Sequence, residues 1–140
     1  MNSDLVYLPV LAHIALVLFL FIRLGSEKSK AFKLGLVDPK VTALNPKAWP
    51  DAVVKISNNI DNQFETPMLF YALVFIYVLC DLLSPLVLGL MLFYVATRYL
   101  HAYVHTTSNY VPNRYKIFVL GMFTLLVLLV ILVGQILLGA

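Results

Sequence analysis

Apolar residues fill two long stretches near the ends of the chain. Segments 5–22 and 117–140 contain no charged residue, and a helix of about 18 or more such residues is long enough to cross a bilayer. Two shorter apolar stretches, 66–80 and 85–97, lie between them. Pro85 begins the second of these, which suits the first turn of a helix that follows a tight connection. The pattern predicts an all-α integral membrane protein with a four-transmembrane-helix bundle.

The boundaries follow from where polar residues interrupt the apolar pattern. Residues 1–140 form one predicted domain, and the stretch after the first apolar segment contains Pro39, Pro46 and Pro50, which is typical of a loop. We expect spans at approximately 4–24, 53–81, 84–107 and 112–139, with an extramembrane loop at 25–51.

Charge gives the orientation of these spans. All ten Lys and Arg residues fall within 23–55 and 98–116, which are the first and third connections with their flanking helix ends. The positive-inside rule makes these two loops cytoplasmic and places both termini on the opposite side. The composition is 61% hydrophobic and 12% charged, which excludes an ordinary soluble domain. The net charge of +3 is a topology signal, so no nucleic-acid partner is expected.

The second span is too short to cross on apolar residues alone. Residues 66–80 cover about 22 Å of a hydrocarbon core roughly 30 Å thick. The helix must therefore include the polar stretch before them, where four polar residues recur on one face: Asn58, Asp61, Asn62 and Glu65. The third span has the same shortage and continues into a second polar stripe: Arg98, His101 and His105.

Glu65 and Arg98 lie at similar distances from the turn at 81–84, roughly 21 to 24 Å along their helices, and this predicts an ion pair between them. Ionisable groups at membrane depth are costly unless they face an interior pocket and find partners, so they indicate a functional site. The alternative is that they only hold the helices together, at roughly 0.6 to 2 kcal/mol per hydrogen bond. His13, midway along the first span, is expected to be hydrogen-bonded inside the bundle.

Two motifs resemble those of the MAPEG family, the membrane-associated proteins in eicosanoid and glutathione metabolism. They are Asn62-Gln63-Phe64-Glu65-Thr66-Pro67, which opens the second span, and Arg98-x-x-His101-x-x-x-His105, which Arg114 follows. The resemblance covers nearly the whole chain and is greatest to bacterial members. It implies a homotrimer in the bacterial inner membrane, with glutathione bound between subunits as co-substrate and a hydrophobic electrophile approaching from the membrane lipids.

The resemblance also implies roles for single residues. Arg114 matches the arginine that stabilises the glutathione thiolate, and four residues match positions that contact glutathione or order the site: Asn62, Glu65, Arg98 and His101. His105 stands where many members have tyrosine, and Tyr94, one turn from Arg98, is a candidate to line the site. Asn58 stands where characterised members have an arginine. An asparagine there forfeits roughly 1.5 to 3 kcal/mol of charge-assisted hydrogen bonding to the tripeptide.

The leading interpretation is a glutathione-dependent membrane transferase or peroxidase that acts on lipophilic electrophiles. The alternative is a non-catalytic protein that binds a lipid or small amphiphile, or a proton-relay bundle. His101 and His105 have the i, i+4 spacing of metal ligands but lack a third ligand nearby in the sequence, so no metal is expected.

Overall fold

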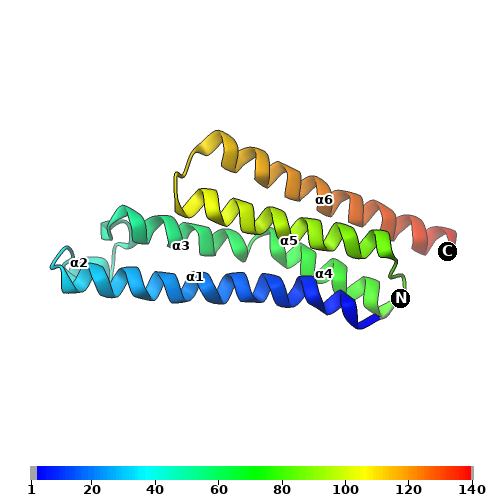
Figure 1. Cartoon of the computed structure of the whole chain (residues 1–140), viewed down its shortest axis with the longest axis horizontal. Coiled ribbons are helices and arrows are strands. Elements are labelled where there is room, and N and C mark those ends of the chain that lie inside the picture. The colour runs from blue at the N-terminus through cyan, green and yellow to red at the C-terminus, as the bar shows by residue number, and fades with distance from the viewer. Residues whose placement is uncertain (1–2, 140) are drawn as a thin grey trace.

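The computed structural model describes residues 3–139, and all its regular elements are helices. In chain order they are η1 (Ser3–Val6), α1 (Tyr7–Lys33), α2 (Pro39–Thr42), η2 (Pro46–Ala48), α3 (Asp51–Gln63), α4 (Thr66–Leu79), α5 (Pro85–Thr106) and α6 (Val111–Leu138). Figure 1 shows an elongated bundle in which α3 and α4 follow each other end to end beside the long helices α1 and α5. Both ends of the chain lie at one end of the bundle, and α2 lies at the other.

Three segments are long and apolar enough to cross a membrane: Asp4–Lys33, Pro85–Thr106 and Val111–Leu138. Many of their large apolar side chains are exposed, for example Leu11, Leu18 and Leu126. An exposed apolar surface of this extent is stable in lipid, where no water has to be displaced from it. The chain is therefore an integral membrane protein.

The segment expected as one span at 53–81 consists of two helices, and Pro67 explains the division. Proline has no N–H and its ring clashes with the carbonyl four residues earlier, which here belongs to Gln63. Helix α3 accordingly ends at Gln63, and α4 begins at Thr66 with Pro67 in its first turn. Between them Glu65 has φ −89° and ψ −92°, outside the helical range. The break leaves backbone carbonyls at the end of α3 free to bind side chains.

Helix α5 is the centre of the bundle. Its buried side chains pack against α1 and α3 on one side and against α6 on the other. One apolar cluster includes Phe70 of α4, Met91 of α5 and Leu128 of α6. A second joins α1, α3 and α5 through Leu16, Ile56 and Ala102. The two clusters hold the helices in fixed positions around the polar residues between them.

Helices α5 and α6 are in close contact at Gly121. A Cβ atom added at this residue would lie 2.9 Å from the Thr97 hydroxyl oxygen and 3.6 Å from the Tyr94 ring. Further along α6, the Tyr77 hydroxyl of α4 donates to the Leu128 carbonyl of α6 at 2.7 Å. These contacts fix the position of α6, the helix that carries Arg114.

Candidate functional site

A set of buried polar side chains lies where α3 gives way to α4. Each is at most 2% exposed, and together they come from α1, α3 and α5: His13, Asn59, Gln63, Arg98 and His105. A buried polar group is costly unless it is hydrogen-bonded. These five side chains form hydrogen bonds with one another and with neighbouring groups.

The bonds form a chain with one direction. The His13 Nε2 atom lies 3.1 Å from the Gln63 Oε1 atom, and because a carboxamide oxygen can only accept, the histidine nitrogen is the donor. The His13 Nδ1 atom therefore accepts from the Tyr71 hydroxyl at 2.6 Å. The expectation that His13 is hydrogen-bonded within the bundle is confirmed.

The same logic extends to α5. The Gln63 amide nitrogen donates to the Asn59 Oδ1 atom at 3.4 Å. The Asn59 amide nitrogen then donates to the His105 Nδ1 atom at 3.1 Å. Hydrogen bonds thus run from Tyr71 to His105 through four helices, and the bond from the Asn59 amide makes the His105 Nδ1 atom an acceptor.

Arg98 joins this chain through Gln63. Its Nε atom donates to the Gln63 Oε1 atom at 3.3 Å, and its Nη2 atom donates to the Asn62 backbone carbonyl at 3.2 Å. That carbonyl is available because the helix is broken after α3. Arg98 is 2% exposed, so neutral oxygens satisfy a charge that is almost completely buried.

Glu65 and Arg98, both described residues, do not form the direct ion pair that was expected, although Glu65 lies close enough to act electrostatically on Arg98. Both residues lie in the described part of the chain, yet Arg98 bonds to Gln63 and Asn62 while Glu65 is exposed. The reason is the break before Pro67, because Glu65 falls between the two helices and does not continue the polar face of α3. The sequence carried a signal for this, since a proline four residues after Gln63 disrupts a continuous helix.

A polar cavity of about 210 Å³ opens beside this buried chain, between the end of α3, α5 and the start of α6. It is lined by Asn62, His101, Val111, Arg114, Tyr115 and Phe118. The Arg114 Nη1 atom donates to the Asn109 side-chain oxygen at 2.7 Å. Asn109 has φ +52°, a left-handed conformation that asparagine tolerates better than most residues. The loop before α6 therefore holds the guanidinium at the edge of the cavity.

His101 provides the second polar group of this cavity. It is 3% exposed, and its Nδ1 atom is buried without a hydrogen-bond partner among the described residues. Its ring lies 5.5 Å from that of His105 and 6.1 Å from that of Phe118, measured between ring centres. A buried nitrogen without a partner, beside an arginine, can bind a polar anionic ligand.

The structure brings together only part of the set predicted from sequence. Asn62, His101 and Arg114 line the polar cavity, and Arg98 and His105 lie in the buried hydrogen-bonded chain. The others are elsewhere. Asn58 is exposed and lines a separate cavity with residues of the loop before α3. Tyr94 is buried, with its ring stacked on Phe70 at 4.9 Å and its hydroxyl 3.3 Å from that of Thr66.

Four site residues were missed by the sequence argument. Asn59, Gln63, Tyr71 and Asn109 each hold a residue of the predicted set or one of its partners. Asn59 and Gln63 have i, i+4 spacing on α3, so they form a second polar stripe beside the stripe of Asn58, Asp61, Asn62 and Glu65. Among residues 3–139, no group of three or more His, Cys, Asp or Glu side chains is placed to hold a metal ion.

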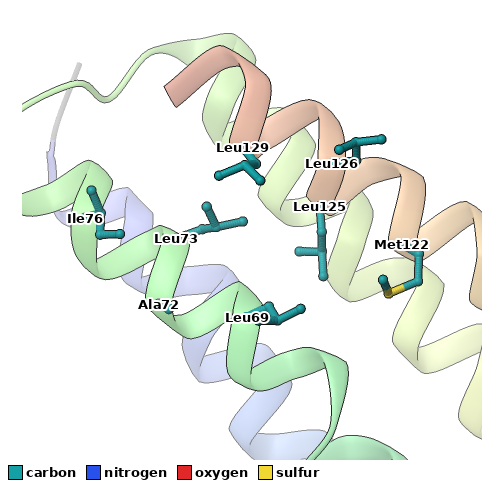
Figure 2. A pocket seen from close by; sticks show the side chains of 8 residues that line it. All are labelled: Leu69, Ala72, Leu73, Ile76, Met122, Leu125, Leu126 and Leu129. Carbon is teal, nitrogen blue, oxygen red and sulfur yellow. The ribbon is translucent and has the colours of Figure 1, made fainter. Parts of the chain in front are cut away.

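An apolar cavity of about 270 Å³ separates α4 from α6. Figure 2 shows side chains of both helices pointing into this gap, and those that line it are Leu69, Ala72, Leu73, Ile76, Met122, Leu125, Leu126 and Leu129. On α6, Arg114, Phe118, Met122 and Leu125 follow at intervals of three or four residues, so they lie on one face. The polar and the apolar cavity are therefore successive sections along the same face of α6.

Comparison with known proteins identifies the family. Searches of curated proteins and of solved structures gave no match. The model of the MAPEG family matches residues 6–134, which include every residue of the polar cavity and of the buried chain. The resemblance noted from the two sequence motifs is thereby confirmed, and the chain belongs to the MAPEG family.

Proposed function

We propose that this protein is a glutathione-dependent membrane transferase or peroxidase that acts on lipophilic electrophiles. The observation that carries the proposal is the polar cavity lined by Arg114 and by His101, whose Nδ1 atom is buried without a hydrogen-bond partner among the described residues. A thiol reacts as its thiolate, and a fixed cation in a site of low dielectric constant stabilises that anion. Arg114 would stabilise the sulfur, and its bond to Asn109 would keep the guanidinium in place during the reaction.

The other polar groups have supporting roles in this proposal. His101 and Asn62 offer hydrogen-bonding atoms to the tripeptide from the wall of the cavity. Arg98 and the chain behind it fix the end of α3, so that Asn62 keeps its position. Glu65 is exposed beside the break, from where its carboxylate could approach the glutathione amino group. In the transferase reaction the thiolate attacks an electrophilic carbon and displaces its leaving group. In the peroxidase reaction it attacks a peroxide oxygen, the O–O bond breaks, and the alkoxide leaves and takes up a proton; the glutathione sulfenic acid then reacts with a second glutathione to give glutathione disulfide and water.

The apolar cavity between α4 and α6 suits the second substrate. Its lining side chains are all aliphatic or methionine, so it can hold an apolar group but offers no side chain that orients a polar one. Because it continues the α6 face that carries Arg114 and Phe118, an apolar molecule in it would have one end near the polar cavity. This arrangement supports a lipophilic electrophile that enters from the bilayer.

We further propose four spans and a homotrimer. The 14 residues of α4 extend only about 21 Å, so α3 must complete the crossing of a core roughly 30 Å thick. With the basic loops cytoplasmic, the polar cavity faces the cytoplasmic side of a bacterial inner membrane. Family membership supports the trimer, in which a neighbouring subunit would cover the open side of the cavity. Chemical cross-linking of the protein in native membranes tests this assembly, and a product no larger than a dimer would contradict it.

Calorimetric titration of the purified protein with glutathione tests the main proposal. Saturable binding is expected, with a lower affinity in Asn62→Ala. Arg114→Ala should lose about a hundredfold or more in turnover with a generic electrophile while its binding falls less. Lys116→Ala is the matched control, because Lys116 is an exposed cation of the same helix. Absence of both glutathione binding and thiol transfer in the wild type would overturn the proposal.

The buried chain from Tyr71 to His105 raises the competing possibility of a proton relay. Two of its links are the carboxamides of Gln63 and Asn59, which do not readily gain and lose protons as an imidazole does. This makes a structural role the better interpretation of the chain. Proteoliposomes with an imposed pH gradient separate the two roles, since a relay would dissipate the gradient and a transferase would not.

A further inference from the structure

A trough of about 180 Å³ runs between α1 and α5, away from the polar cavity. Each helix contributes four residues with spacings i, i+3, i+4 and i+7, so both lining stripes are regular helix faces. The lining residues are Leu16, Phe19, Leu20, Arg23, Tyr99, Ala102, Tyr103 and Thr106. Most of the trough is apolar, and its polar groups lie toward its ends.

A hydrogen bond between the two helices closes each end of the trough. At the α2 end of the bundle, the Arg23 Nη1 atom donates to the Thr106 hydroxyl at 3.3 Å. At the other end, the Tyr99 hydroxyl donates to the Ala12 carbonyl at 2.7 Å. Tyr99 and Thr106 are seven residues apart, or about 10 Å along the helix. Ala102 lies between these bonds and lines the floor of the trough.

The Arg23 guanidinium at one end of the trough has no carboxylate partner among the described residues that line it. A guanidinium has five N–H donors, and the bond to Thr106 occupies one of them. None of the described residues that line the trough is Asp or Glu. A second cation lies near, because the Lys55 ammonium donates to the Thr107 carbonyl at 3.3 Å. Two positive charges, those of Arg23 and Lys55, therefore lie near the end of α5 and next to an apolar trough.

The surroundings indicate a ligand from the membrane. Phe19 and Tyr103 form the outer rim and are 54% and 68% exposed, so the trough opens toward lipid. Arg23 is 16 residues beyond the start of α1, about 24 Å along the helix, which places it near the headgroup level of one leaflet. Basic pockets between transmembrane helices on the cytoplasmic side are known to bind anionic lipid headgroups.

We propose that this trough is a binding site for one anionic phospholipid, with its phosphate on Arg23 and an acyl chain along the exposed side chains of Phe19 and Tyr103. The inference is independent of the glutathione reaction, because the trough shares no lining residue with the polar cavity. A bound lipid would fill the space between α1 and α5 and stabilise their packing.

The test uses the full-length protein reconstituted into vesicles of equal parts phosphatidylglycerol and phosphatidylcholine. After extraction in mild detergent, native mass spectrometry counts the lipids retained by each subunit. The wild type should retain one phosphatidylglycerol in preference to phosphatidylcholine. Arg23→Gln should weaken this retention about tenfold or more, as expected when a charge-assisted hydrogen bond is lost. Lys33→Gln removes the same charge from an exposed position of α1 and should retain the lipid.

A further variant and a competing ligand test the same proposal. Arg23→Lys preserves the charge without the planar fork and should give intermediate retention, which covers the case that Arg23→Gln does not fold. Glycerol phosphate, which lacks acyl chains, should not displace the lipid. Equal retention of both lipids by the wild type, equal losses in Arg23→Gln and Lys33→Gln, or displacement by glycerol phosphate would overturn the proposal. So would a change in oligomeric state that accompanies every loss of lipid, because the trough would then be a subunit contact.

Discussion

Substitution of Gly121 by alanine tests how closely α5 and α6 are packed beneath the polar cavity. The new Cβ atom would lie 2.9 Å from the Thr97 hydroxyl oxygen, which is closer than van der Waals contact allows. Thr97 cannot rotate away without losing the 2.6 Å bond from its hydroxyl to the Tyr94 carbonyl. Such overpacking typically costs about 2 kcal/mol, and the better helix propensity of alanine returns about 1 kcal/mol. We expect a net loss of about 1 kcal/mol in the free energy of unfolding.

The assay is reversible unfolding in mixed micelles, with two comparison proteins. Gly134→Ala adds the same methyl group to the same helix where nothing lies within 4 Å, so it should leave stability unchanged or raise it. Adding Thr97→Ala to Gly121→Ala removes the clashing oxygen and should recover part of the loss in a double-mutant cycle. If Gly121→Ala proves as stable as Gly134→Ala, the close approach of α5 and α6 is not as described.

Three further predictions concern the buried bonds and position 58. Tyr77→Phe removes the hydroxyl that donates to the Leu128 carbonyl and should lower the free energy of unfolding by about 1 kcal/mol; an unchanged unfolding midpoint would contradict this. His13→Leu leaves the Tyr71 hydroxyl without its partner and removes one of the two donors to the Gln63 Oε1 atom. This change should cost about 1 to 3 kcal/mol and should weaken glutathione binding in calorimetry, whereas full affinity would show that the chain does not position the site. Asn58→Arg should raise glutathione affinity about tenfold or more by adding a charge-assisted hydrogen bond, and no gain on titration would mean that this position does not reach the ligand.

The sequence was sufficient to predict the helical membrane protein, and it suggested a region for the site that remains a proposal. The membrane protein follows from apolar runs that are longer than a soluble core can accommodate. The region proposed for the site follows from the shortage of apolar residues before Thr66 and after Thr97. Asn62, His101 and Arg114 do line one cavity. The prediction of a helical membrane protein succeeded because it depends on the length and hydropathy of the apolar runs, which tertiary packing does not change.

The details of the polar face could not be predicted in the same way. The most charged stripe of α3 was expected to turn inward, but Asn58, Asp61 and Glu65 are exposed, and the neighbouring stripe with Asn59 and Gln63 is buried. A neutral carboxamide costs less to desolvate than a carboxylate and can both donate and accept. Which of two adjacent faces is buried depends on the partners across the bundle, and His13 and Arg98 come from helices far away in the sequence.

The break after α3 has a consequence for how the chain tolerates change. Arg98 is held by the main-chain oxygen of Asn62, an atom that every amino acid supplies. Replacement of the side chain at 62 can thus alter what the cavity recognises without releasing the guanidinium. The residue that cannot be exchanged is instead Pro67. A residue with an N–H at this position would allow α3 to continue as a helix, and the carbonyls at the end of α3 would then accept helical hydrogen bonds. A proline that lines neither the polar nor the apolar cavity is thus the residue on which the binding of Arg98 depends.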